Sequence, residues 1–250
     1  MSPVEQIIGL VVVLLFGVLI GVYSSKRVRT RFPVSFRKIE AINRLKRAVG
    51  MAVEDGSRLH VSLGSAQLND PSNTSAFVGL NVLHRVGQLT STSDLPPTCS
   101  TGSGGLSILG QDTLKATSIE TNTRAFYDPD HASMTGATPF SYAIGAMETL
   151  NGSDVKGNIL VGKFGVEAGL LCEAVEPERL SITGSDSIVA QSIFYAYTKD
   201  TLIGEELYAL PAYLAASAVH QASLRVEDLF RFGVGVVLVI GALLALAGVL

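Results

Sequence analysis

The stretch "TCSTGSGGLSILGQDTL", from Thr98 to Leu114, holds the pattern that decides the fold. A short β-type run leads into a loop of glycines and serines, and an amphipathic helical run follows directly. The same order of strand, glycine-bearing loop and helix recurs at "RLHVSLGS" (58–65), "GNILVGKFG" (157–165) and "LSITGSD" (180–186). Short strands that alternate with helices of about 10 to 20 residues predict an α/β fold with a mainly parallel sheet.

Helical periodicity fills the intervals between these strands. Gly56 suits the position just after a first amphipathic helix, and Asp70 followed by Pro71 suits the start of the next one. Residues 127–140 are rich in turn formers, and residues 203–230 are mostly helical with an expected interruption at Pro211. Apolar residues at spacings of three and four predict helices at 36–53, 71–89, 105–121, 141–152, 166–176 and 187–197.

Two uncharged segments lie at the ends of the chain. Ile7–Tyr23 has 17 residues and Phe232–Leu250 has 19, enough to cross or nearly cross a hydrocarbon layer of ~30 Å. A cleaved signal peptide is the alternative for the first segment, but basic residues follow it and none precedes it. A buried core helix is the alternative for the second, but a helix that is apolar on every face fits poorly into so small a domain. We therefore predict two transmembrane helices.

Basic residues flank the two apolar segments on their inner sides. Because Lys and Arg are in excess on the cytoplasmic side of membranes, both flanks predict a cytoplasmic middle and two outer termini at the cell inner membrane. The residues after the first segment, which we call the basic collar, are also expected to attract anionic lipid headgroups. The collar consists of Lys26, Arg27, Arg29, Arg31, Arg37, Lys38, Arg44, Lys46 and Arg47.

The body of the chain is acidic. Residues 48–228 contain 9 Lys and Arg against 20 Asp and Glu, a net charge of −11, which disfavours binding to nucleic acid. Cys99 and Cys172 are too few for a disulfide scaffold and are expected to stay reduced in the cytoplasm. The predicted regions are a transmembrane anchor at 1–25, a basic juxtamembrane amphipathic helix at 26–57, a cytoplasmic α/β domain at 58–228 and a transmembrane helix at 229–250.

The glycine-bearing loops form the candidate ligand site. In a parallel sheet they lie at the carboxyl edge, where open α/β folds bind ligands and helix N-termini attract anions. The alternative is plain turn chemistry, and it is favoured because Ser107 stands where a dinucleotide-binding pattern needs its third glycine. The candidate ligand-binding residues are Gly64, Ser65, Thr101, Gly102, Ser103, Gly162, Lys163, Gly184, Ser185 and Asp186.

Catalytic and metal-binding patterns are weak. The sequence has neither G-x-S-x-G nor H-E-x-x-H. His131 stands beside Asp128 and Asp130, but Asp-Pro-Asp is ordinary turn chemistry. Glu167 and Glu173 on one predicted helix are expected on a solvated face rather than as a catalytic pair. We therefore expect no catalytic residue, no metal and no cofactor.

Small residues four apart occur in both apolar segments, at Gly17 and Gly21 and at Gly241 and Ala245. This spacing lets helix backbones approach closely. We therefore expect the two segments to pack on each other or on another chain. Besides the lipid bilayer, the expected partners are a second copy of the chain or other membrane subunits.

The chain resembles a family of uncharacterised bacterial membrane proteins that share a domain of unknown function. The resemblance rests on "RKIEAINRLKRAVGMAVEDGSRLHVSLGS" (37–65), "GQDTL" (110–114), "TPFSYAIG" (138–145), "IGEELYALPAYL" (203–214) and the two apolar ends. It covers nearly the whole chain and implies a membrane protein with a Rossmann-like body and no assigned catalytic residue. We expect a non-catalytic scaffold or small-ligand sensor, with a membrane-bound enzyme or a nucleotide- or anion-binding protein as the alternative.

Overall fold

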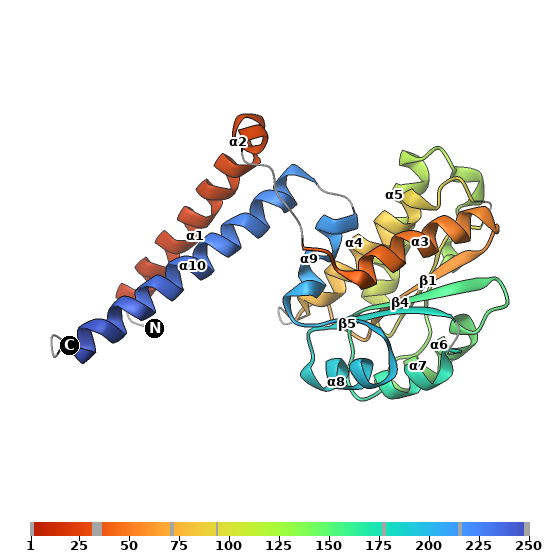
Figure 1. The fold of residues 1–250 in the computed structure, drawn as a ribbon. Helices are drawn as coiled ribbons and strands as arrows, with labels where there is room; N and C mark the ends of the chain where they lie inside the picture. Colours follow the sequence, from red (N-terminus) through yellow and green to blue (C-terminus); the bar gives the residue numbers. More distant parts are fainter. Residues whose placement is uncertain are drawn as a thin grey trace. The chain divides into compact units, whose positions relative to one another are not determined.

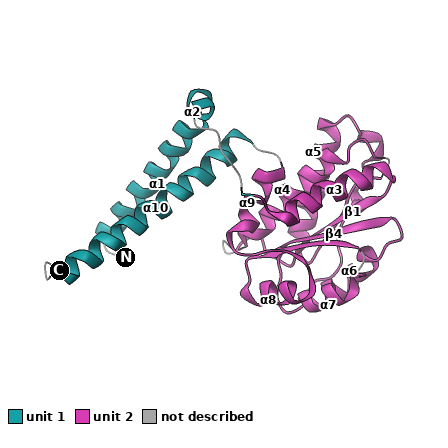
Figure 2. Ribbon diagram, viewed as in Figure 1, with its two compact units in different colours: residues 1–37, 215–250 teal, residues 38–214 magenta. Residues whose placement is uncertain are grey.

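The computed structural model describes residues 3–31, 37–70, 73–93, 95–176, 179–214 and 217–247. The chain forms two compact units, which Figure 2 colours separately. We call Met1–Arg37 with Ala215–Leu250 the helical unit, and Lys38–Leu214 the sheet unit. The predicted positions Phe36 and Pro71 lie outside the described residues.

The sheet unit has six parallel strands in the described part of the chain. They are β1 (Arg58–Gly64), β2 (Thr98–Thr101), β3 (Ala132–Met134), β4 (Val155–Lys163), β5 (Leu180–Ser185) and β6 (Asp200–Leu202). Their order across the sheet is β3-β2-β1-β4-β5-β6, and every pair of neighbours is parallel. This is the order of Rossmann folds, in which the winding reverses between β1 and β4. The predicted α/β fold with a parallel sheet is confirmed.

Helices cover both faces of the sheet (Figure 1). They are α3 (Glu40–Glu54), α4 (Thr74–Leu89), α5 (Gly104–Glu120), α6 (Pro139–Leu150), α7 (Ala168–Ala174), α8 (Ile188–Tyr197) and α9 (Glu205–Leu214). One face packs against α3, α4, α5 and α9, and the other against α6, α7 and α8.

The two faces of the sheet differ in chemistry. On β1, Leu59, Val61 and Leu63 belong to the apolar core under α3 and α4. Successive side chains of a strand point to opposite faces, so His60 and Ser62 lie on the α6 side. All five side chains are buried, as expected for the centre of a parallel sheet.

The basic amphipathic helix packs onto the sheet unit through its apolar stripe. α3 begins at Glu40, and Ile42, Leu45 and Val49 are buried in the apolar core. Gly56 follows the helix end with a φ of +64°, the left-handed conformation expected just after a helix. The exposed face of α3 carries the last residues of the basic collar.

Some elements differ from the predictions. β3 and β6 each have three residues, too few to give a periodic pattern, and β3 lies within the turn-rich segment. The N-cap of α4 is Asn73 rather than Asp70. The predicted interruption at Pro211 is wrong, because α9 continues through this residue to Leu214. Leu207 and Leu210 are buried in the core and hold the helix in place although proline removes one backbone hydrogen bond.

The helical unit contains α1 (Pro3–Ser24), the short α2 (Lys26–Arg31) and α10 (Ala218–Leu246), with α1 and α10 side by side (Figure 1). The rings of Phe16 and Phe230 are in contact, with centroids 5.5 Å apart. Val4–Ser24 and Ala218–Leu246 are each long and apolar enough to cross a membrane, and the most apolar part of each is unburied.

Candidate functional site

The structure brings the candidate ligand-binding residues to one edge of the sheet. Because β2, β1, β4 and β5 are parallel neighbours, the loops that follow them meet at the carboxyl edge. The winding reverses between β1 and β4, so Gly64, Ser65 and Lys163 stand where such folds open a ligand crevice. Gly64 and Lys163 pair directly across the two strands.

Two backbone N–H groups at this edge donate hydrogen bonds to backbone carbonyls of the same edge. The Ser65 N–H donates to the Lys163 carbonyl at 2.9 Å, and the Gly102 N–H donates to the Gly64 carbonyl at 2.8 Å. These two bonds tie together the loops after β1, β2 and β4. A bound phosphate would need donors of this kind. Both donors are therefore already used by the fold.

Gly64 and Gly102 allow the loops to approach this closely. Gly64 has a φ of +77°, and a Cβ there would collide with the Lys163 carbonyl oxygen. A Cβ at Gly102 would lie 2.8 Å from Cβ of Ser65 and 3.1 Å from the ring of Tyr142. The glycines at this edge serve the contact between loops.

Glu167 occupies the place of an anion beside the reversal of winding. Its carboxylate accepts hydrogen bonds from the Gly165 N–H at 2.8 Å and the Ser65 hydroxyl at 3.4 Å. Glu167 is only 2% exposed, so its predicted place on a solvated helix face is wrong, whereas Glu173 is exposed. The reason is that α7 begins only at Ala168, which leaves Glu167 free to fold over the preceding loop.

Two side chains contact the start of α5. The Thr101 hydroxyl donates to the carbonyl of Ser103, the N-cap residue of α5, at 3.0 Å. A Cβ at Gly105 would come within 2.6 Å of the Leu68 side chain, which therefore lies over this helix end. The Leu68 side chain thus packs beside the first turn of α5.

The remaining candidate residues also have partners within the loops. Lys163 and Asp186 form an ion pair, with 3.2 Å between Nζ and Oδ1. The Ser185 hydroxyl accepts from the Phe164 N–H at 3.3 Å. The last two candidates, Gly162 and Gly184, lie buried inside β4 and β5.

A chain of buried polar side chains lies between the sheet and α6. His60 places Nε2 2.9 Å from the Ser100 hydroxyl and Nδ1 3.2 Å from Oδ1 of Asn158. The Ser100 and Ser62 hydroxyls are hydrogen-bonded at 3.2 Å, and the Ser62 hydroxyl is hydrogen-bonded to the hydroxyl of Tyr142. All five residues are fully buried. This network was not predicted from the sequence.

Burial sets the protonation state of the network. Desolvation lowers the pKa of His60 to about 4, against the opposing effect of its hydrogen bond to Asn158, so the imidazole is neutral at pH 7. Burial also raises the pKa of Tyr142. The Ser100 hydroxyl, the His60 imidazole and the Asn158 amide are arranged in the order of a nucleophile, a base and an orienting group in a catalytic site. The network is fully buried, so its polar groups bond to one another rather than to solvent.

A cavity of about 590 Å³ lies at the opposite, amino edge of the sheet. The C-cap residues of α3, α7 and α8 all line it, so three negative helix ends surround it. Basic side chains offset these ends, and two of them form ion pairs, Arg44 with Asp200 at 2.8 Å and Arg179 with Glu176 at 2.9 Å. The other charged residues that line the cavity are Asp55, Lys156 and Lys199.

Within the residues that the structure describes, no three metal-ligating side chains gather. Asp128 accepts from the Asp130 N–H at 2.9 Å, which is turn chemistry, and desolvation, then Arg58, lowers the pKa of the neighbouring His131. Cys99 and Cys172 are free and buried, and burial raises both thiol pKa values, that of Cys172 to about 12.

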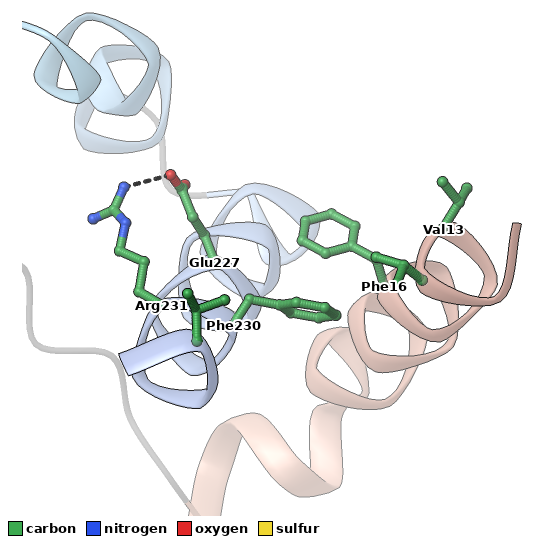
Figure 3. A pocket seen from close by; sticks show the side chains of 7 residues that line it. Val13, Phe16, Glu227, Phe230 and Arg231 are labelled. Atoms are coloured by element: carbon green, nitrogen blue, oxygen red, sulfur yellow. Dashed lines mark hydrogen bonds and ion pairs between the residues drawn. The ribbon is translucent and has the colours of Figure 1, made fainter. Parts of the chain in front are cut away.

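A hollow of about 580 Å³ lies between α1 and α10 (Figure 3). Phe16 and Phe230 line it together with Glu227 and Arg231, which form an ion pair at 2.6 Å. The small residues of the two helices do not make this contact. A Cβ at Gly17, Gly21 or Gly241 would meet nothing within 4 Å, and Ala245 is exposed.

Comparison with known proteins identifies a family without assigning an activity. A family model described as "Domain of unknown function (DUF6754)" matches residues 2–250. No curated protein and no solved structure matches the chain. Function has to be argued from the geometry.

Proposed function

We propose a function, based on the structure, for this chain, which belongs to the family described as Domain of unknown function (DUF6754). We propose that it is a membrane-anchored α/β domain on the cytoplasmic face of the inner membrane, acting as a non-catalytic scaffold or small-ligand sensor. The two apolar helices provide the anchor, and the basic collar next to α1 lies on the cytoplasmic side.

The closed carboxyl edge is the observation that carries the non-catalytic part of this proposal. Open α/β folds bind nucleotides with free N–H groups at the reversal of winding. Here the N–H groups of Ser65 and Gly102 donate to neighbouring loops, and the buried Glu167 carboxylate occupies the place of the anion. A phosphate would have to displace all three interactions.

Chemical rescue tests whether Glu167 acts as a built-in anion. We expect Glu167→Ala to lower the melting temperature of the full chain in detergent, because the Gly165 N–H loses its acceptor. Added formate should restore part of the loss in the variant and leave the wild type unchanged. Glu173→Ala, at an exposed position in α7, is the matched control and should show neither effect.

The opposite result would support the alternative functions. If nucleotides or phosphate stabilise the wild-type chain, and replacing Gly102 and Ser103 abolishes that stabilisation, the carboxyl edge is a ligand site. The anchoring is tested separately by extraction of membranes with alkaline carbonate. Digestion of the sheet unit by protease added to intact spheroplasts would contradict the cytoplasmic location.

The amino-edge cavity favours the sensor form of the proposal. Its volume lies within the range typical of small-molecule sites, and Lys156 and Lys199 line it without an ion-pair partner among the described residues. A metabolite that stabilises the wild type should stabilise Lys156→Ala with Lys199→Ala less. If this double variant responds like the wild type, the cavity is not the sensing site.

A further inference from the structure

Two lysines at the amino edge of the sheet have no charged partner. Lys156 is the second residue of β4 and Lys199 directly precedes β6, so the two lysines stand on either side of β5. Both line the amino-edge cavity, and neither forms an ion pair or a side-chain hydrogen bond with a residue that the structure describes. Because neighbouring strands lie about 4.8 Å apart, the strands that carry them are about 10 Å apart. Two lysine side chains can bridge this separation to hold one anionic group.

The other basic side chains of the cavity are already engaged. Arg44 forms an ion pair with Asp200, and Arg179 forms one with Glu176 and also donates to a backbone carbonyl at the end of α6, at 3.2 Å. Among the described residues that line the cavity, Asp55 is the one carboxylate outside these pairs. Two free lysines therefore face a single free carboxylate, a balance that favours an anionic ligand.

A buried hydroxyl between the two lysines also lacks a partner. Ser181 is the second residue of β5 and lines the same cavity. Its Oγ is buried and has no hydrogen-bond partner among the described residues. Buried hydroxyls nearly always have a partner, because an unpaired one has lost its hydrogen bonds to water without replacement. A polar group of a bound molecule would complete this part of the cavity.

The end of α7 offers hydrogen-bond acceptors at the same place. Cys172, in the last turn of α7, and its C-cap residue Val175 both line the cavity. The backbone carbonyls of residues 172–174 accept no hydrogen bond from any residue that the structure describes. Carbonyls at a helix end need donors, and they carry a partial negative charge that repels a bare anion. Hydroxyl groups on the ligand would supply the donors.

We propose that the amino-edge cavity binds an acidic metabolite that carries hydroxyl groups, of which a sugar phosphate is a simple example. This inference rests on the proposed function and names the ligand class for its sensor form. Lys156 and Lys199 bind the anionic group, whereas Ser181 and the end of α7 bind the hydroxyl groups. The two requirements together exclude a purely apolar ligand and a cationic one.

Binding of three acidic compounds to the full chain in detergent tests this site. The compounds are glucose 6-phosphate, 3-phosphoglycerate and gluconate. Glucose is the comparison without the anionic group, and sulfate is the comparison without the hydroxyl groups. We expect at least one acidic compound to bind in isothermal titration calorimetry. Glucose and sulfate should each bind at least about tenfold more weakly, because each satisfies only part of the site.

Matched variants locate the binding. Lys156→Ala with Lys199→Ala should weaken it by at least about tenfold, because two charge-assisted hydrogen bonds are lost, and Ser181→Ala should weaken it by about threefold. Lys115→Ala, at an exposed position of α5, is the control and should bind like the wild type. The melting temperature without ligand should be the same in the double lysine variant and the wild type, since neither lysine has a partner to lose.

Three outcomes would overturn the ligand class: binding of none of the acidic compounds, equal binding of glucose or sulfate, or unchanged affinity in the double lysine variant. Carbonate extraction of membranes that contain the same chains separates this inference from the proposed function. A chain that stays in the membrane but binds none of the compounds contradicts the ligand class alone, whereas one that is extracted contradicts the anchoring. Binding that is lost on replacing Gly102 and Ser103, but not the lysines, would place the ligand at the carboxyl edge and contradict both.

Discussion

The glycines at the carboxyl edge of the sheet and those of the two apolar helices look alike in the sequence but have opposite surroundings. At Gly64 a Cβ would collide with the backbone of the neighbouring strand, and at Gly102 it would press on Ser65 and Tyr142. At Gly17 and Gly241 a Cβ would meet nothing. The first set is required by contacts within the chain, whereas the second set has no close neighbour among the described residues.

This contrast separates a structural glycine from a candidate binding residue. The sheet edge has the order of strands and loops that nucleotide-binding folds use, yet its donors and its buried carboxylate are engaged with one another. The apolar helices carry no known ligand pattern, yet they expose an ion pair and a stripe of small residues. Of these two sets, the glycines without close neighbours are therefore those of the helices.

The largest expected effect is at the sheet edge. Gly64→Ala should lower the free energy of unfolding by about 3–5 kcal/mol, because it combines a left-handed backbone with overpacking against Lys163. Gly56→Ala is the control, since it shares the positive φ but would meet no neighbour, and it should lose only about 1 kcal/mol. Urea unfolding of the full chain in detergent measures both. Equal losses would show that the edge is not closely packed.

The next effect is the pH dependence that His60 confers. Its folded-state pKa of about 4 lies below the ordinary value of 6.5, so between these two values the unfolded chain binds the proton and the folded chain does not. Stability is therefore fully present above pH 6.5 and falls by about 3 kcal/mol as the pH drops to about 4. His60→Gln should flatten this part of the profile of unfolding free energy against pH. An unchanged slope in the variant would mean that His60 is accessible to protons in the folded chain.

A smaller effect is expected within the same polar network. Tyr142→Phe removes the hydroxyl that bonds Ser62 and should lower the free energy of unfolding by about 1–2 kcal/mol. Tyr195→Phe makes the same change at a residue that is 71% exposed and should alter stability by less than about 0.5 kcal/mol. Thermal unfolding followed by circular dichroism compares the two. If Tyr142→Phe leaves the free energy of unfolding unchanged, the bond between Tyr142 and Ser62 does not stabilise the fold.

The smallest effect on the fold is expected in the helical unit. Gly17→Ile with Gly21→Ile should change the melting temperature of the sheet unit little, because both positions are open. Because small residues four apart favour close helix packing, the same double variant should reduce crosslinking between copies. A large fall in melting temperature would show that these glycines are needed within the chain, and the contrast between the two sets would fail.

The fold was predictable because glycines lie at or near the ends of four strands and because the helices are periodic. The short strands β3 and β6 were not, because three residues carry no period. The loops were correctly placed at one edge, but the sequence does not show that Ser65 donates to Lys163 and Gly102 to Gly64. That closure depends on which strands are adjacent, and adjacency is a property of the sheet.

Two further features could not be predicted from the sequence: the buried polar network and the position of Glu167. His60 and Ser62 alternate with apolar residues on β1, and Ser100 and Asn158 hold equivalent places on β2 and β4. This alternation was visible, but only the order of the strands brings the four side chains together. Glu167 was expected on a solvated face because the predicted helix began at residue 166, whereas α7 begins two residues later, at Ala168, which places Glu167 over the loop.

Amide hydrogen exchange at the carboxyl edge tests the closed edge most directly. If Ser65 and Gly102 donate to Lys163 and Gly64 as the structure shows, their amides should exchange about as slowly as those in β1, without any ligand. Nucleotides and phosphate should leave these rates unchanged. Fast exchange of both amides in the free protein, with slowing on addition of a nucleotide, would contradict the account and reopen the edge as a binding site.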